Sequence, residues 1–345
     1  GLDRVEIRRI NMVPPSAIPY DNQLGMVYDS GDFPLSMEQA VKLANWTGFE
    51  ARREAAYLRG RLRGIGIANY IDLSTGAPRE RAEITVDSRE QHIDVVIGTL
   101  AAGQGHETSF GQVVADLLEV PYETVRLITG DTDIVKVGGG THSGRSMRMG
   151  AIVLSNAATE IIERGKVIAS HLLEAAESDI EYGAGRFTVT GTDRSIGRFT
   201  VAGTDRSIGL FEVAAAAQEQ VDLPVELYGP LAGQSEINEP TPAFGNGCHV
   251  CEVEIDPDTG VVDIVRYTAI DDVGRAINPL LIDGQTHGGI APGAGQALME
   301  KSHYDPETGQ LLSGTFMDYA MPRARDFPSF VTAITEVPAP TNPLG

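Results

Sequence analysis

The feature that most constrains the fold of this chain is a four-residue word, Gly-Gln-x-His, which occurs at residues 103–106 and again at 284–287. Each copy follows two short segments in which apolar and polar residues alternate, joined by a polar turn. This pattern is typical of a β-hairpin, so we expect one hairpin over residues 83–97 and another over 250–267.

Apolar residues at helical spacing follow each word, over residues 110–118 and 294–299. Each word is therefore expected near the N-terminus of a helix, where free backbone amides and the positive end of the helix dipole favour an anion. The repeated order of hairpin, word and helix predicts an α+β fold with two related β-hairpin and helix halves that face one ligand.

Length and charge restrict the class of protein. The 345 residues exceed one typical domain, and 42% apolar content with 39 glycines indicates a soluble, loop-rich globular protein. A net charge of −21 argues against a nucleic-acid-binding surface, which needs clustered Lys and Arg. No apolar run is long enough to span a membrane. The first residue is not a methionine, so we expect a piece of a longer protein.

The spacing of apolar residues predicts a short helix over residues 1–11 and one amphipathic helix over about 37–59. Ser36 and Gln39 have the spacing of a capping box at the start of the second helix. A strand-rich composition begins at Arg61, so we place a domain boundary there, between residues 1–60 and 61–345.

A long helix is predicted over about residues 147–177. It is followed by a tandem duplication, in which residues 185–196 recur as 197–208 with only Thr190 changed, to Ala202. Two short copies do not make a solenoid, which needs about three longer repeats or more. We expect an enlarged surface hairpin without a catalytic role.

Three glycine-rich segments, at residues 103–108, 130–133 and 138–146, form the strongest candidate site. Glycines let backbone amides approach a ligand, and hydroxyl groups with Arg145 are donors suited to phosphate. The alternative is a set of ordinary glycine turns and helix caps. A Rossmann site is disfavoured, because Ser143 stands where the third glycine of Gly-x-Gly-x-x-Gly is needed, and no Walker lysine follows any glycine loop.

The run Cys248-His249-Val250-Cys251 is the only candidate for a cysteine-ligated metal site. On the predicted strand, residues three apart point to opposite faces, and no further ligands are nearby, so we expect structural cysteines and no metal held by protein side chains. Two cysteines suit a reducing compartment.

Asp271 and Asp272 form either a coupled pair at a strand end or a solvated loop, and we favour the loop.

Taken together, the motifs at 103–108, 130–133 and 138–146, with Ile277-Asn278-Pro279 and residues 284–289, resemble the molybdenum-binding large subunit of the xanthine oxidase (molybdenum hydroxylase) family. Within that family the large chain of aerobic carbon monoxide dehydrogenases is the most similar. The resemblance covers nearly the whole chain. It implies that residues 1–60 are the end of a first molybdenum-cofactor subdomain and that 61–345 are the second.

In this family molybdenum is held by the dithiolene of a pterin, often extended to molybdopterin cytosine dinucleotide, so no Cys or His need contact the metal. The resemblance implies cofactor contacts at the start of the first predicted helix, around the phosphate end and from the other half. The corresponding residues here are Gln104, Gly105, His106 and Thr108, then Gly140, Thr141, His142, Ser143, Gly144, Arg145 and Ser146, and finally Asp272 and Gln285.

The resemblance also implies a reaction and partners. The family hydroxylates substrates with oxygen from water, or oxidises carbon monoxide, and electrons leave through iron–sulfur centres to flavin. We therefore expect an FAD-binding medium subunit and a [2Fe-2S] small subunit, in a cytoplasmic dimer of heterotrimers. The family's catalytic glutamate would lie just beyond Gly345, so no catalytic residue is expected in this chain, and the 345-residue fragment alone is expected to be inactive.

The sequence departs from the family pattern at one glycine segment, and an alternative function is also open. The order Ser143-Gly144-Arg145 replaces the Gly-Ser-Arg of many relatives and, with the duplication, disfavours carbon monoxide as the substrate. The alternative function is a non-catalytic nucleotide-binding, anion-binding or assembly module, whose glycine loops bind a nucleotide without redox chemistry.

Overall fold

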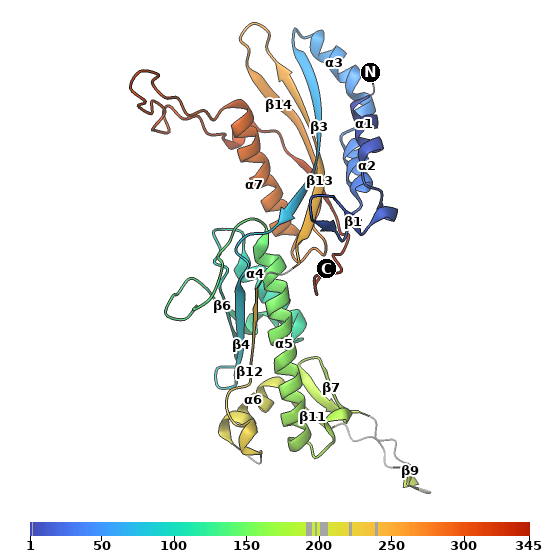
Figure 1. Ribbon diagram of the computed structural model, residues 1–345, viewed down its shortest axis with the longest axis vertical. Helices are drawn as coiled ribbons and strands as arrows, with labels where there is room; N and C mark the ends of the chain where they lie inside the picture. Colours follow the sequence, from blue (N-terminus) through green and yellow to red (C-terminus); the bar gives the residue numbers. More distant parts are fainter. Residues whose placement is uncertain (2, 191–194, 197–198, 201–205, 221–222, 239–240) are drawn as a thin grey trace. The chain divides into compact units, whose positions relative to one another are not determined.

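The computed structural model describes residues 1, 3–190, 195–196, 199–200, 206–220, 223–238 and 241–345. The chain forms two compact units, labelled by their elements in Figure 1. The first unit contains Gly1–Leu73, Ala243–Pro340 and Gly345, and the second contains Ser74–Pro242 and Thr341–Leu344. Both units combine helices with sheets, which confirms the predicted α+β class.

The first unit is built on a four-stranded sheet with the order β15-β14-β13-β3. Strands β13 and β14 are antiparallel and are the second predicted hairpin, and β15 lies parallel to β14. The strands of this sheet are β3 (Leu62–Ser74), β13 (Ala243–Ile255), β14 (Val262–Asp272) and β15 (Val331–Thr335), with a separate two-stranded sheet of β1 (Tyr20–Asp21) and β2 (Val27–Tyr28).

Helices cover both faces of this sheet. Figure 1 shows α1 (Arg4–Asn11), α2 (Phe33–Leu43) and α3 (Phe49–Tyr57) on one face, and α7 (Pro279–Leu298) on the other. The core under α1 and α2 contains Met37, Ala40, Cys248, Val250 and Ile270. Because α1 and the alternating buried residues of β13 meet here, this face is fixed by the hydrophobic pattern of the sequence.

The predicted helix over residues 1–11 is confirmed as α1, but the single helix over 37–59 is wrong. The chain turns at Asn45, which has a left-handed backbone (φ 48°), and α2 and α3 are separate helices. The capping box is also wrong, because Asp32 caps α2 and Ser36 is buried inside it, donating to the Asn246 side chain at 3.1 Å. Pro34 in the first turn marks the true start.

The second unit contains a four-stranded sheet with the order β12-β4-β5-β6. Its antiparallel pair β4–β5 is the first predicted hairpin, which is confirmed. Helix α5 packs against β4 and β12, and α4 packs against α5. The elements are β4 (Glu80–Asp87), β5 (His92–Ile97), β6 (Val125–Ile128), β12 (Ala232–Ile237), α4 (His106–Leu117), α5 (Arg145–Leu172) and α6 (Leu210–Glu219).

The predicted long helix is α5, which ends at Leu172 rather than near 177, because the chain reverses at Glu174 with a positive φ of 46°. Beyond it lies a small sheet with the order β11-β8-β7. The short elements are β7 (Ile180–Gly183), β8 (Arg186–Val189), β9 (Ser195–Ile196), β10 (Phe199–Thr200), β11 (Ser207–Gly209) and the 3₁₀ helices Pro15–Ala17, Trp46–Gly48, Tyr122–Thr124, Glu177–Asp179, Val225–Leu227 and Ala324–Asp326.

The two ends of the tandem duplication lie in this small sheet. The start of the first copy pairs with the end of the second, with Thr188 opposite Ser207 and Phe187 opposite Ile208. Residues 191–194, 197–198 and 201–205 lie outside the described residues. The expected surface hairpin therefore stays a prediction.

The change from the first unit to the second falls after Leu73, not near Gly60. Strand β3 keeps residues 62–73 in the first unit because it pairs with β13. Arg63 on β3 also forms ion pairs with Glu252 and Glu254 on β13, at 2.8 and 3.0 Å. The assignment of residues 1–60 and 61–345 to two family subdomains stays a prediction.

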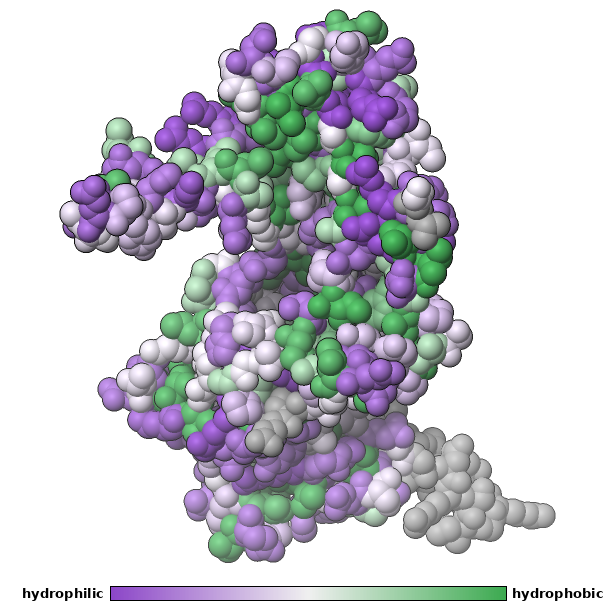
Figure 2. Space-filling model, turned by 45° about the horizontal axis from the view of Figure 1, so that its top comes forward, coloured by the Kyte–Doolittle hydropathy of each residue, from purple (hydrophilic) through white to green (hydrophobic). Residues whose placement is uncertain are grey.

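Beyond α7, an irregular segment over residues 299–330 projects from the first unit (Figure 1). Phe316 and Met317 on this segment are 81% and 93% exposed. Figure 2 shows hydrophilic and hydrophobic residues interspersed over the visible surface. Among the helices of the described residues, none is long and apolar enough to cross a bilayer.

Candidate functional site

The first Gly-Gln-x-His word lies at the start of α4, as predicted. Gly105 is the N-cap residue, with a left-handed backbone (φ 74°) and no side-chain hydrogen bond to the helix amides. The oxygen of the Gln104 side chain accepts from the Ala102 amide at 2.6 Å, which holds the carboxamide over its own turn. The helix therefore begins with amides that no side chain caps, an arrangement that favours an anion.

His106 anchors this turn. The residue is 5% exposed, and its ring lies 4.8 Å from the Phe110 ring with Nδ1 3.2 Å from the Thr99 carbonyl oxygen. Burial lowers the pKa of His106, so the ring is neutral near pH 7, and Nδ1 carries the proton because a carbonyl only accepts. His106 thus ties the end of β5 to the first turn of α4.

The glycine segment at residues 138–146 leads into α5 in the same way. Gly144 is the N-cap residue with a φ of 67°, and again no side chain caps the helix amides. Thr141, His142 and Ser143 are exposed, whereas Ser146 is buried and donates to the Thr141 hydroxyl at 3.2 Å. Exposed hydroxyl and imidazole groups therefore directly precede a second uncapped helix start.

Direct contacts join residues 98–100, in the loop between β5 and α4, to the glycine segment at residues 138–146. The Thr141 hydroxyl donates to the Leu100 carbonyl oxygen at 2.6 Å. A Cβ atom on Gly98 would lie 2.2 Å from the Gly138 Cα atom, so only glycines let these backbones pass. By contrast, a Cβ atom on Gly103 or Gly140 would meet nothing within 4 Å, which leaves open space beside each backbone. In the second unit, α4 and α5 therefore both begin without a side-chain cap. The loops that precede these helices contact each other, and both contain glycines with open space beside the backbone.

Arg145 lies inside the second unit. Its side chain is fully buried and pairs with Glu80 at 2.8 Å, also fully buried. The guanidinium also donates to the carbonyl oxygens of Ala77, Arg79 and Gly140, at 3.0, 3.0 and 2.5 Å. These bonds direct the donors into the protein, so the predicted phosphate contact of Arg145 stays a prediction.

Glu80 was missed by sequence reasoning. Its signal was present, because Glu80 is in phase with Ala82, Ile84 and Val86, the buried residues of β4. A carboxylate at a buried position of an alternating strand indicates a charged partner in the fold.

In the first unit the second word is not at a helix start. Helix α7 begins at Pro279, with Asn278 as a side-chain cap that accepts from the Leu281 amide at 3.1 Å. Residues 284–287 therefore lie inside α7, and the predicted N-terminal position is wrong for this copy. Gln285 is exposed, while the neighbouring Thr286 faces the sheet.

The solvated loop expected at Asp271 and Asp272 is also wrong, because both residues end β14 and are buried. Asp271 accepts hydrogen bonds from the Tyr70 hydroxyl at 2.7 Å and from Nε2 of His249 at 2.9 Å. The Thr286 hydroxyl of α7 donates to it at 2.8 Å. Burial disfavours the carboxylate, but these hydrogen bonds outweigh it and lower the pKa of Asp271.

Asp272 has a different environment. One oxygen accepts from the amides of Gly274 and Val337, at 3.1 and 3.2 Å, while the buried Oδ2 has no hydrogen-bond partner among the described residues. Such a group is costly unless a partner reaches it. Asp272 and Gln285 belong to the first unit and Gln104 to the second, so their convergence on one ligand stays a prediction.

The cysteines lie outside this network. Both are free, Cys248 faces the core under α2 and Cys251 faces the opposite side of β13. Burial raises the pKa of Cys248 to about 12 and that of Cys251 to about 11, so both are protonated thiols near pH 7. Within the described part of the chain, no three His, Cys, Asp or Glu side chains are grouped to hold a metal ion.

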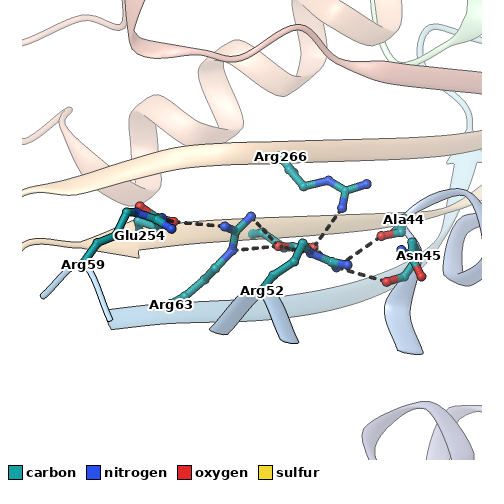
Figure 3. Close-up of polar contacts among 8 residues, drawn as sticks. Ala44, Asn45, Arg52, Arg59, Arg63, Glu254 and Arg266 are labelled. Atoms are coloured by element: carbon teal, nitrogen blue, oxygen red, sulfur yellow. Dashed lines mark hydrogen bonds and ion pairs between the residues drawn. The ribbon is translucent and has the colours of Figure 1, made fainter. Parts of the chain in front are cut away.

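Another buried carboxylate, Glu252, belongs to an arginine cluster in the first unit. Figure 3 shows Arg52, Arg63 and Arg266 of this cluster. Arg52 and Arg63 each donate to Glu252 through Nε, at 3.1 and 2.9 Å. Arg52 also donates to the Asn45 carbonyl oxygen at 3.0 Å. This cluster fastens α3 and the turn at Asn45 to β13, so its role is structural.

Comparison with known proteins gives the same family throughout. Residues 39–328 match the family model described as "Molybdopterin cofactor-binding domain". The chain is 32% identical over 360 residues to the carbon monoxide dehydrogenase large chain of Afipia carboxidovorans, covering 100% of this chain and 43% of that protein.

Two solved structures are similar to the same degree. A Cu,Mo-CO dehydrogenase in its carbon monoxide reduced state has a TM-score of 0.88 and 31% identity, covering 100% of this chain and 44% of that one. Quinoline 2-oxidoreductase from Pseudomonas putida 86 has a TM-score of 0.88 and 31% identity, covering 99% and 44%. The chain thus spans less than half the length of these relatives.

Proposed function

Because the chain belongs to the family of molybdopterin cofactor-binding domains, we propose that it forms part of the catalytic large subunit of a molybdenum-dependent oxidoreductase. In this proposal the cofactor is molybdopterin cytosine dinucleotide. The single observation that carries the proposal is the family match over residues 39–328. The two uncapped helix starts on joined glycine loops support it, because a pterin dinucleotide is anionic at its phosphates.

The chain's own groups divide into contacting and supporting residues. The amides at the starts of α4 and α5 would bind phosphate oxygens, and the open backbones of Gly103 and Gly140 allow a close approach. Exposed His142 and Ser143 and the amide group of Gln104 would donate the directional hydrogen bonds, while the Thr141 hydroxyl donates to Leu100 and supports the loop. His106, Arg145 and Ser146 would keep these loops in place rather than contact the cofactor themselves.

The first unit would supply contacts from α7 and the end of β14. Gln285 is exposed, and Asp271 holds its helical turn through Thr286. Asp272 offers one buried oxygen that the described residues leave unpaired, which suits a donor on the pterin. When bound, the molybdenum centre would supply the oxidation–reduction chemistry. The protein groups named here bind and orient it.

The rest of the proposal concerns the whole enzyme. We propose that the complete large subunit assembles with an FAD-binding medium subunit and a [2Fe-2S] small subunit, as a cytoplasmic dimer of heterotrimers. Carbon monoxide and quinoline enzymes resemble the chain equally, so neither substrate is favoured by similarity. The catalytic glutamate would lie outside this chain, and the 345-residue chain alone would be inactive.

Analysis of the native complex tests this function. We expect one molybdenum atom and one cytidine monophosphate per large subunit, measured by elemental analysis and by chromatography after acid hydrolysis. Absence of molybdenum from the folded, native complex would contradict the proposal and favour a non-catalytic anion-binding or assembly module. Molybdenum without cytidine would overturn the dinucleotide form.

A further inference from the structure

We infer that Glu80 and Arg145 are positioning residues that hold the loops of the second unit in the arrangement needed for cofactor binding. This inference rests on the proposed function. It differs from the expected phosphate contact, because neither side chain is exposed and the two pair at 2.8 Å inside the unit. We call this pair the loop clamp.

The loop clamp connects three separate segments. One Glu80 oxygen accepts from the Gly98 amide at 3.0 Å, and the other accepts from the Gly139 amide at 3.4 Å. Arg145 donates to the carbonyl oxygens of Ala77 and Gly140, at 3.0 and 2.5 Å. The turn before β4, the end of β5 and the glycine segment before α5 therefore all meet at one ion pair.

The glycine loop packs tightly against the loop clamp at two positions. A Cβ atom on Gly139 would lie 2.6 Å from the guanidinium carbon of Arg145, and one on Gly76 would lie 2.6 Å from the His142 ring. The glycine loop is thus folded directly over the guanidinium. Because a buried charge without its partner is strongly unfavourable, losing either member of the loop clamp releases the backbone groups that it holds.

The location of the loop clamp gives it a role beyond stability. Arg145 is the first residue of α5, directly after the exposed residues Thr141, His142 and Ser143. Glu80 opens β4 and holds Gly98, ahead of the loop that carries Gln104. A shift of either backbone moves a helix start that we propose to face the cofactor. Cofactor binding should therefore depend on the loop clamp more strongly than folding does.

The test uses the full-length large subunit in its native complex. The variants are Glu80→Gln, Arg145→Lys and the double change Glu80→Gln with Arg145→Met, and Glu252→Gln is the matched control. Glu252 is also a buried, arginine-paired carboxylate, but it lies in the first unit. Three quantities are measured for each: melting temperature, amide hydrogen exchange over residues 98–104 and 138–144, and molybdenum content per folded subunit.

For Glu80→Gln we expect exchange in both loops to rise by about tenfold or more, as for a lost charge-assisted hydrogen bond. Molybdenum content should fall several-fold. Arg145→Lys keeps the positive charge but loses the planar set of guanidinium donors. Its loop exchange and molybdenum content should therefore lie between those of Glu80→Gln and the wild type. Glu252→Gln should lower the melting temperature while leaving loop exchange and molybdenum content at wild-type values.

The double variant separates positioning from stability. Replacing a buried ion pair by uncharged side chains often restores stability, so its melting temperature should recover while loop exchange stays fast and molybdenum content stays low. Recovery of all three quantities would mean that the loop clamp is only structural and would overturn the inference. Unchanged loop exchange in both Glu80→Gln and Arg145→Lys would overturn it as well. Molybdenum missing from the wild type would instead refute the proposed function.

Discussion

Asp271 and Asp272 are adjacent at the end of β14, yet their carboxylates have opposite hydrogen-bonding environments. Asp271 accepts from Tyr70, His249 and Thr286, whereas Asp272 keeps one buried oxygen that the described residues leave unpaired. The first is complete within the protein, and the second is suited to receive a donor from elsewhere. Adjacent residues of one type can therefore have different roles, which only the fold determines.

The Asp271 network predicts a pH-dependent effect on stability. Asp271→Asn should lower the free energy of unfolding at pH 7 by about 1–3 kcal/mol, because Nε2–H of His249 loses a charged acceptor. The pKa of Asp271 is lowered in the folded protein, so its stabilisation is present above the unfolded value of about 3.9 and is lost as the pH falls through the folded value.

Urea denaturation at pH 7 and pH 3 measures this effect. The difference between wild type and Asp271→Asn should shrink at the lower pH, and Asp258→Asn, in the exposed turn of the same hairpin, should show almost no difference at either pH. An equal loss at both pH values would contradict the ionised network.

The close approach of Gly98 to Gly138 predicts an effect on stability. Gly98→Ala should destabilise the protein by about 1–3 kcal/mol, because the new methyl group would overlap the Gly138 backbone, which cannot rotate away. Gly66→Ala, on β3 with nothing within 4 Å of its Cβ position, is the control. Thermal unfolding measures both. Equal melting temperatures for the two variants would show that the loops can separate freely.

At the scale of elements, local patterns predicted those structures whose cause is local. Both hairpins, α1, α4 and α5 follow from alternation or helical spacing in their own residues. The turn at Asn45 was missed because the apolar spacing continues through it. Its carbonyl accepts from Arg52, and Arg52 binds Glu252, which is 200 residues away. Distant partners of this kind cannot be read from a window of neighbouring residues.

The absence of distant partners from a local sequence window also explains which parts of the candidate site were predicted. The glycine segments were found because glycine and hydroxyl residues cluster in sequence. Glu80 was missed, and its pairing with Arg145 was not predicted, because the two residues are 65 positions apart. The start of α7 was missed although Asn278-Pro279 is a local start signal. The helix start was placed at residues 284–287 instead, because the repeated word was expected to lie at a helix N-terminus.

The turn between α2 and α3 carries a prediction of its own. Asn45→Ala should cost about 1–2 kcal/mol, because a left-handed backbone is strained for residues other than Gly and Asn. Asn45→Gly should be near neutral, since glycine adopts this backbone freely. Urea denaturation of the two variants measures the difference. Equal loss in both would indicate that the Asn45 side chain, and not its backbone, sets the turn.

At the scale of the whole molecule, the two units have different connectivity. The second unit is almost one continuous stretch, Ser74–Pro242, whereas the first is formed by two stretches on either side of it. Each unit contains one predicted hairpin followed by one copy of the repeated word. The repeat therefore marks one candidate ligand-binding segment per unit.

This connectivity predicts that residues 74–242 fold on their own. A protein of these residues should unfold cooperatively on heating, because its sheet and its helices α4, α5 and α6 are all contained within it. Residues 1–73 should not unfold cooperatively alone, since β3 would lack its neighbour β13. Circular dichroism with temperature checks both. A cooperative transition for residues 1–73 would show that the first unit is not built as described.

The interruption of the first unit by the second also sets an order of events during synthesis. When β3 leaves the ribosome, its neighbour β13 does not yet exist, and the whole of residues 74–242 must be translated before that strand emerges. The inserted unit can meanwhile complete its own core. Met37, Ala40 and Ile67 can therefore complete their shared core with Cys248 and Val250 only after β13 (Ala243–Ile255) has been translated.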